Sequence, residues 1–245
     1  MVYLILSVLL QFAFVVHIVK TGRSTTWIWI VLMLPMAGIL AYLFLEVLPD
    51  LGNTRQGRRA SQKVKEALNP NKDINDASAR YQQSDTVENS MNLANACLEK
   101  GLYEEAKQLF EKCLKGPLAD DPNLMFGLAK AEFGLGNAAD TQRILDELIE
   151  KNPEFKHQDA HLLYARSLDR LDKVSDAQHE YETLYSYYTG PDAAYYYAKF
   201  LSANNAGNKA QKIFSEIVSS AQSQSHHYRD LHKTIINQAK SELRH

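Results

Sequence analysis

Cysteine is scarce in this chain, and long apolar runs are absent after its first 49 residues. The two cysteines, Cys97 and Cys113, are too few for a disulfide framework, and both fall at positions that we expect to be buried between helices. The formal net charge is only −2, so the basic excess typical of nucleic-acid-binding proteins is missing. Glycine-rich phosphate loops and nucleophile motifs are also missing, and we therefore expect no enzyme activity and no cofactor.

The first 49 residues contain only three charged side chains, Lys20, Arg23 and Glu46. Two apolar runs, over residues 2–19 and 27–48, come near the length of about 20 residues that a helix needs to cross a bilayer. The loop between them is too short for anything except a tight turn. We therefore expect residues 1–49 to form a two-helix transmembrane hairpin.

The second apolar run resembles the N-terminal membrane hairpin of bacterial cardiolipin synthases, a hairpin of the phospholipase D N-terminal type. That family has a tryptophan, an apolar stretch, Pro-x-x-Gly, and then aliphatic residues and a tyrosine. The matching residues here are Trp27, Pro35, Gly38 and Tyr42. The resemblance implies a location in the bacterial inner membrane, in contact with its lipids. The family commonly has glycine near the position of Glu46, so this chain departs from the pattern there.

The proline and the glycine of this motif have separate structural roles in the expected hairpin. Pro35 removes a backbone donor and kinks the second helix, which is tolerated in lipid when a neighbouring helix satisfies the freed carbonyl. Gly38, with Ala37 and Ala41, forms a face of small residues that can pack closely on the first helix. Recognition of a lipid head group or of a membrane protein by the motif is the alternative to plain packing.

The catalytic signature of the cardiolipin synthases is absent from this chain. In those enzymes His-x-Lys-x-x-x-x-Asp occurs twice; its histidine attacks phosphorus, and its lysine neutralises charge on the phosphoryl oxygens. None of the histidines here is followed by lysine two places on. His226, His227 and His232 lie close in sequence, but no cysteine or acidic residue completes a ligand set, and we predict no metal site.

Residues 50–84 are expected to form basic and polar linker helices. Within them, the segment Arg55–Lys65 can either lie on anionic lipid head groups or serve as an ordinary solvated linker. Basic residues close to a membrane span tend to stay in the cytoplasm. This segment therefore predicts that both ends of the hairpin, and the rest of the chain, are cytoplasmic.

A helical signature returns every 33 to 36 residues between Leu93 and Val218. Its anchor residues, spaced 35, 36 and 33 apart, are Ala106, Thr141, Ala177 and Ala210. Such a period is typical of a helix-turn-helix solenoid whose units bury their apolar faces against their neighbours. We expect an all-α chain in which the hairpin precedes an α-solenoid of about four repeats over residues 85–225, closed by a capping helix over residues 226–245.

The repeats resemble the tetratricopeptide family across roughly residues 85–221. In that family small residues let paired helices approach, and a large residue fills the space between units. The small positions of the first helices are Ala94, Ala129, Ala165 and Ala198, and the large residues of the second helices are Phe110, Leu145, Tyr181 and Phe214. Asp172 and Asn205 depart from the family, because glycine is usual at those turns.

The first helices of such repeats line a concave face, where equivalent positions form rows. We predict an apolar row of Met91, Phe126, Leu162 and Tyr195, a polar and basic row of Asn95, Lys130, Arg166 and Lys199, and an acidic row of Glu88, Asn123, Asp159 and Asp192. Tyr196 is expected at the groove as well. An extended or helical segment of a protein partner could bind there, with its carboxylates on the basic row. A solvated face that balances its own charges is the alternative.

Three functions are compatible with these features. The first is a bacterial inner-membrane scaffold that presents cytosolic repeats to a protein or peptide partner at raised effective concentration. The second is a regulatory or assembly factor for envelope phospholipid metabolism that acts through its hairpin. The third is a phospholipid-modifying enzyme, which the missing histidine and lysine signature disfavours. We expect the first.

Overall fold

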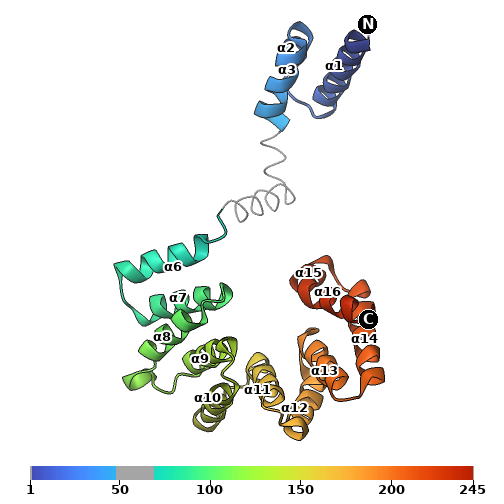
Figure 1. Ribbon diagram of the computed structural model, residues 1–245. Coiled ribbons are helices and arrows are strands. Elements are labelled where there is room, and N and C mark those ends of the chain that lie inside the picture. Colours follow the sequence, from blue (N-terminus) through green and yellow to red (C-terminus); the bar gives the residue numbers. More distant parts are fainter. Residues whose placement is uncertain (1, 48–68, 245) are drawn as a thin grey trace. The chain divides into compact units, whose positions relative to one another are not determined.

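The computed structural model describes residues 2–47 and 69–244, and every regular element in those residues is a helix. The all-α prediction is therefore confirmed for the part of the chain that is described. The chain divides into two compact units, Met1–Lys72 and Asp73–His245 (Figure 1). The basic segment Arg55–Lys65 lies outside the described residues.

The first unit is a helical hairpin. Helix α1 (Val2–Lys20) is joined by a short turn to α2 (Thr26–Met33), which is followed by α3 (Pro35–Tyr42) and a π-helical turn, η1 (Leu43–Val47). Helix α1 packs against α2 and α3 around a small core of Ile18, Val31, Ile39 and Tyr42. Among the described residues, no helix combines the length and the apolar character needed to cross a bilayer.

The expected second membrane span, residues 27–48, is not a single helix. It stops at Met33, because Leu34 leaves the helical region with φ −125° and ψ 78°, and Pro35 begins a new helix. A residue before proline is disfavoured in the helical region, and proline suits a first turn, where no N–H is needed. The three pieces have 8, 8 and 5 residues, so the prediction of a transmembrane hairpin is not supported by the described helices.

The motif residues Trp27 and Tyr42 meet inside the hairpin, and Gly38 lies against the backbone of α2. A side-chain carbon at Gly38 would lie 2.4 Å from the carbonyl oxygen of Ile30, so the glycine lets α3 approach α2, and not α1 as the small-residue face predicts. Tyr42 is fully buried, with its ring centre 5.4 Å from that of Trp27. The Tyr42 hydroxyl lies 3.1 Å from Nδ1 of His17, which ties α3 to α1.

Glu46, which departs from the cardiolipin synthase pattern, closes the hairpin through polar contacts. Its carboxylate forms an ion pair with Arg23 in the turn and accepts a hydrogen bond from Nε1 of Trp27 at 3.0 Å. The side-chain amide of Gln11 donates to the carbonyl of Val31 at 2.9 Å. These polar contacts join the helices, whereas many large apolar side chains are exposed, among them Leu9, Phe12, Val19, Trp29, Met33, Leu40, Phe44 and Leu45.

The second unit is a solenoid of helices that follow one another along an arc (Figure 1). Its helices are α6 (Lys72–Gln83), α7 (Val87–Glu99), α8 (Tyr103–Cys113), α9 (Pro122–Leu135), α10 (Ala138–Lys151), α11 (Gln158–Arg170), α12 (Val174–Tyr187), α13 (Asp192–Ala203), α14 (Gly207–Ser223), α15 (His226–Leu231) and α16 (Lys233–Glu242). A 3-10 turn, η2 (Gly116–Leu118), lies between α8 and α9. The helix pairs from α7–α8 to α13–α14 are the four predicted repeats.

The residues predicted to lie inside the repeats are buried. The small positions Ala94, Ala129, Ala165 and Ala198 have no exposed surface, and Phe110, Leu145, Tyr181 and Phe214 are almost fully buried. Cys97 and Cys113 are free thiols in the core of the first repeat, as expected. Because the buried clusters join residues of neighbouring repeats, each repeat depends on the next for its stability.

Two glycines on α9 set the distance between the first two repeats. A Cβ atom at Gly127 would lie 2.3 Å from the ring of Phe110, and one at Gly134 would lie 2.4 Å from the ring of Tyr103. Both rings belong to α8. A side-chain carbon does not fit at such distances, so α8 lies against α9 only because both positions lack a side chain.

Each repeat turns at a residue in the left-handed backbone region. The angle φ is +73° at Gly101, +89° at Gly136, +55° at Asp172 and +61° at Asn205. The last two are the positions where the sequence departs from the usual glycine. The turn conformation is thus kept although the residue type differs, at a cost of roughly 1–2 kcal/mol for most residues and less for Asp and Asn.

The solenoid extends beyond the predicted repeats at its start, and its cap is divided. Helix α6 packs on the first repeat, where Ile74 joins the core and Ala77 is buried. The expected capping helix over residues 226–245 is two helices, α15 and α16, with the break at His232. Helix α16 packs against α14, and its Ala239 joins the core of the last repeat, so it covers the end of the solenoid.

Candidate peptide-binding groove

The first helices of the repeats, α7, α9, α11 and α13, lie on the inner side of the arc, and the second helices lie outside them (Figure 1). Three residues of the predicted basic row, Asn95, Lys130 and Arg166, line one cavity of about 740 Å³. The fourth, Lys199, does not line this cavity; its Nζ pairs with the carboxylate of Glu242 on α16 at 2.9 Å. The cavity therefore gathers three of the four predicted polar residues.

The predicted apolar row belongs to the packed core. Phe126 exposes 9% of its surface, Leu162 exposes 6% and Tyr195 exposes 8%, while Met91 is partly buried beside the core of the first repeat. The ring of Tyr195 packs against Phe214, with 5.8 Å between their centres. A partner in the groove would therefore meet the polar row and the walls of the cavity, and hardly these apolar side chains.

The cavity also contains residues that the sequence reasoning did not identify. Its walls include the apolar residues Leu98, Phe133 and Leu163, the polar Tyr103, the acidic Glu99 and a third cation, Arg170. Arg170 lies one helical turn after Arg166 on α11, so the four-residue spacing of two arginines was a signal that could have found it.

Aromatic rings hold the two arginines in place. The guanidinium carbon of Arg166 lies 3.9 Å from the ring centre of Tyr196 and 4.6 Å from that of Phe133. The guanidinium of Arg170 lies 3.6 Å from the same Phe133 ring and donates to the Phe133 carbonyl at 2.7 Å. Tyr196, predicted at the groove, thus contacts Arg166, a residue of the cavity wall, but does not itself line the cavity. Within the described part of the chain, neither arginine forms an ion pair with a carboxylate.

Burial and mutual repulsion destabilise the charged forms of the basic side chains that line the cavity. Burial lowers the pKa of Lys130, against the opposing influence of Asp159 and Glu99, and its Nζ lies 4.8 Å from the centre of the Phe126 ring. Burial lowers the pKa of Arg170 as well, and the charge of Arg166 lowers it further, against the opposing influence of Tyr196 and Asp169. An anion that enters the cavity would compensate these partly desolvated charges.

Two residues of the predicted acidic row, Asp159 and Asp192, contact other side chains of the same chain. Asp159 accepts a hydrogen bond from the hydroxyl of Tyr188 at 2.5 Å, and Asp192 lies 3.3 Å from Nδ1 of His232. Burial raises the pKa of Asp192, and the contact with His232 opposes that change. In the described residues, no group of three or more His, Cys, Asp or Glu side chains could hold a metal ion.

Comparison with known proteins gives a fold but no close relative. No protein-family model matches the chain, and no curated protein matches it. A thermophilic tetratricopeptide protein of Thermus thermophilus is similar in structure, with 15% identity and a TM-score of 0.56 over 70% of this chain and 89% of its own.

Two further solved structures have the same arrangement of helices. A tetratricopeptide repeat protein from Parabacteroides merdae has 16% identity and a TM-score of 0.54 over 84% of this chain and 77% of its own. MamA from Desulfovibrio magneticus has 13% identity and a TM-score of 0.53 over 69% of this chain and 94% of its own. None of these matches supports the resemblance of the hairpin to cardiolipin synthases. The second unit has a tetratricopeptide-repeat fold.

Proposed function

We propose that this protein is a protein-interaction scaffold whose repeats bind a segment of a partner protein in the concave groove. The observation that carries the proposal is the cavity where Lys130, Arg166 and Arg170 converge. Partly desolvated cations favour an anionic partner, and the carboxylates of a polypeptide are such anions. The fold supports the same conclusion, because solenoids of this kind present extended concave surfaces and use them for binding.

The partner segment is extended or helical and places an acidic side chain in the cavity. Arg166 offers a planar group that can hold a carboxylate through two parallel hydrogen bonds. The apolar walls formed by Leu98 and Leu163 can receive a neighbouring aliphatic side chain of the partner. The pairing of the partner's carboxylate with the cations of the cavity sets the position and orientation of the segment, while the apolar contacts add affinity.

On the evidence of its sequence, we also propose that the protein lies at a bacterial inner membrane, with its repeats in the cytoplasm. The structural support for this location is the exposure of large apolar side chains on the hairpin, including Phe12, Trp29 and Phe44, around the inward contacts of Glu46. Large exposed apolar patches mark membrane or protein contacts. Alkaline extraction of membranes tests this location: retention of the full chain supports it, and release into the supernatant contradicts it.

Charge reversal in the cavity tests the binding proposal. A variant with Lys130, Arg166 and Arg170 all changed to glutamate should lose the partner in a pull-down from cell extract. A single substitution, Arg166→Gln, disturbs the fold less than three charge reversals do, and it should also reduce recovery of the partner. The control is Lys199→Gln, since Lys199 pairs with Glu242 outside the cavity and should leave recovery unchanged. Undiminished recovery by the triple variant, with native helicity, would contradict the proposal.

The alternative function, a regulatory or assembly factor for envelope phospholipid metabolism, is not favoured by any contact of the described residues. It differs from the scaffold in one testable respect, because it requires the hairpin to recognise a lipid or a membrane enzyme. Exchange of residues 1–49 for an unrelated two-helix anchor should preserve the activity of a scaffold. Loss of function after the exchange would favour the alternative.

A further inference from the structure

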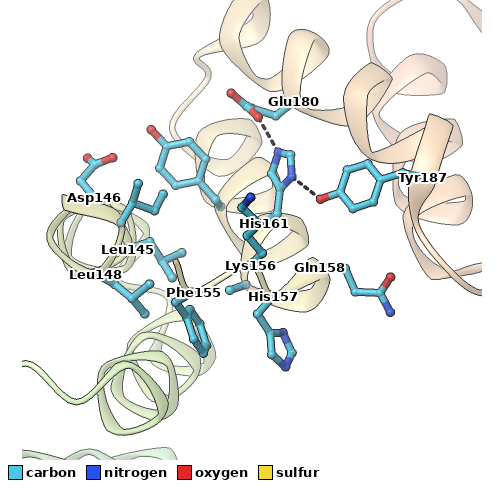
Figure 2. A pocket seen from close by; sticks show the side chains of 13 residues that line it. Leu145, Asp146, Leu148, Phe155, Lys156, His157, Gln158, His161, Glu180 and Tyr187 are labelled. Carbon is cyan, nitrogen blue, oxygen red and sulfur yellow. Dashed lines mark hydrogen bonds and ion pairs between the residues drawn. The ribbon is translucent and has the colours of Figure 1, made fainter. Parts of the chain in front are cut away.

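A second cavity, of about 800 Å³, opens between α10, α11 and α12 (Figure 2). It is lined by the second helices α10 and α12, by the first helix α11 and by the connection between α10 and α11, and it has no residue in common with the groove cavity. We call it the outer pocket, because α10 and α12 lie on the outer side of the arc. Its volume falls in the range of pockets that hold small molecules or large side chains. The cavity is therefore a possible binding site that is separate from the groove.

The floor of this outer pocket is apolar. Leu145 and Leu148 of α10 are buried beneath it, and Phe155 from the connection to α11 forms one side (Figure 2). Ile149 also lines the pocket and exposes 56% of its surface. Water against this surface can be displaced favourably by an aliphatic or aromatic side chain.

His161 fixes the opposite wall. Its Nε2 lies 2.5 Å from the carboxylate of Glu180, and its Nδ1 lies 2.6 Å from the hydroxyl of Tyr187, both on α12 (Figure 2). The two contacts use both ring nitrogens and hold α11 to α12. Burial and a hydrogen bond to Asp146 raise the pKa of Tyr164, another lining residue, to about 12, so its hydroxyl remains a donor at neutral pH.

The lining of the pocket has more carboxylates than lysines. Asp146 and Glu180 line it, against one lysine, Lys156. Helix α12 has the acidic residues Asp176, Glu180 and Glu182 and no lysine or arginine. The two basic residues of α10 are already paired with carboxylates: Arg143 with Asp140, and Lys151 with Asp120 and Glu147. The charge at the pocket therefore complements a cation.

We infer that the outer pocket is a second docking site, which binds a basic segment of a protein partner with a large apolar side chain beside a lysine or arginine. The apolar side chain occupies the floor formed by Leu145, Leu148 and Ile149. The neighbouring cation lies at the rim, near Asp146 and Glu180. The groove and the outer pocket have opposite charge preferences, so the scaffold can hold two different partners at once.

A fluorescent peptide, acetyl-Gly-Lys-Leu-Lys-Phe-Lys-Gly amide, tests the inference by anisotropy titration on the full chain. One matched peptide has glutamate in place of lysine, and another has serine in place of Leu and Phe. The first peptide should bind, and both matched peptides should bind at least about tenfold more weakly. Equal binding of the three peptides, or no binding of the first, would overturn the inference.

Variants of the full chain identify the site that the peptide occupies. Ile149→Glu and Asp146→Lys change exposed side chains of the pocket, and each should weaken binding at least about tenfold. Val174→Glu is the matched control, because Val174 is an exposed aliphatic residue of α12 that does not line the pocket. Arg166→Gln should leave peptide binding intact, because Arg166 lines the groove cavity and not the outer pocket. Loss of peptide binding by this variant would place the peptide in the groove and contradict the inference. Undiminished binding by both pocket variants would also overturn the inference.

Discussion

The guanidinium carbon of Arg166 lies 3.9 Å from the ring centre of Tyr196, and this contact joins the third repeat to the fourth. The same guanidinium lies 4.6 Å from the ring centre of Phe133 in the second repeat. This side chain of the third repeat thus contacts the first helices of the second and fourth repeats. Arg166, which lines the groove cavity, therefore also contacts the repeats on either side of its own.

Replacement of Arg166 with lysine should weaken partner binding although the positive charge is kept. Lysine cannot stack as a plane or hold a carboxylate through two parallel hydrogen bonds, so we expect a loss of about 1–2 kcal/mol, near tenfold in affinity. Quantitative pull-down across a range of bait concentrations measures the change. Equal affinities of Arg166→Lys and the wild type would show that only charge matters at this position.

Replacement of Lys130 with methionine should stabilise the fold and weaken partner binding. Burial lowers the pKa of Lys130, so folding favours its neutral form, and the charged form costs stability at neutral pH. The gain from Lys130→Met should be largest near pH 7 and shrink as the pH rises toward the ordinary lysine pKa of 10.5. Denaturant unfolding of both proteins at pH 7 and pH 10 measures the difference. A Lys130→Met variant less stable than the wild type at pH 7 would contradict this reading of the cavity.

Replacement of Gly127 with alanine should destabilise the second unit by roughly 1–3 kcal/mol, because the new methyl group overlaps the Phe110 ring and forces the two helices apart. Thermal unfolding followed by circular dichroism measures the change. Gly207→Ala is the matched control, since no atom lies within 4 Å of a Cβ at that helical position. The control should be neutral or slightly stabilising. Equal melting temperatures of the two variants would show that α8 and α9 are not in such close contact.

Replacement of Asp172 with glycine should stabilise the third repeat. Asp172 has φ +55°, a conformation that glycine adopts without steric cost, so we expect a gain of about 0.5–1 kcal/mol. The same change at Asn205 should give a smaller gain, because asparagine tolerates this region better than most residues. Urea unfolding midpoints measure both variants. A destabilised Asp172→Gly protein would mean that the aspartate side chain contributes contacts that outweigh its backbone cost.

The repeat interior could be predicted because its constraints are local and periodic. A position where two helices touch, such as Ala94 or Ala165, accepts only a small side chain, and the spacing returns with each repeat. The same logic identified Phe110 as a large interior residue. The turn positions were also visible as departures from glycine, and their backbone angles confirm the alignment of the four repeats.

The surface of the groove was harder to predict because it depends on tertiary contacts. Whether Phe126 and Tyr195 are buried or open is decided by how far each first helix rotates against its neighbours. The pairing of Lys199 with Glu242 requires the position of α16, which no repeat pattern specifies. In the hairpin, the sequence predicted one second span kinked at Pro35, whereas the helix breaks at Leu34 because of the backbone limits that proline imposes on the preceding residue.

Site-specific photo-crosslinking in living cells tests the central claim, occupation of the groove by a partner, most directly. A photoreactive residue at Leu98, in the wall of the groove cavity, is compared with one at Leu135, an exposed residue of α9 outside it. The proposal predicts one discrete adduct from position 98 that disappears when Arg166 and Arg170 are changed to glutamate. It predicts no such adduct from position 135. Identical adduct patterns from both positions, or an adduct at 98 that survives charge reversal, would contradict the proposed function.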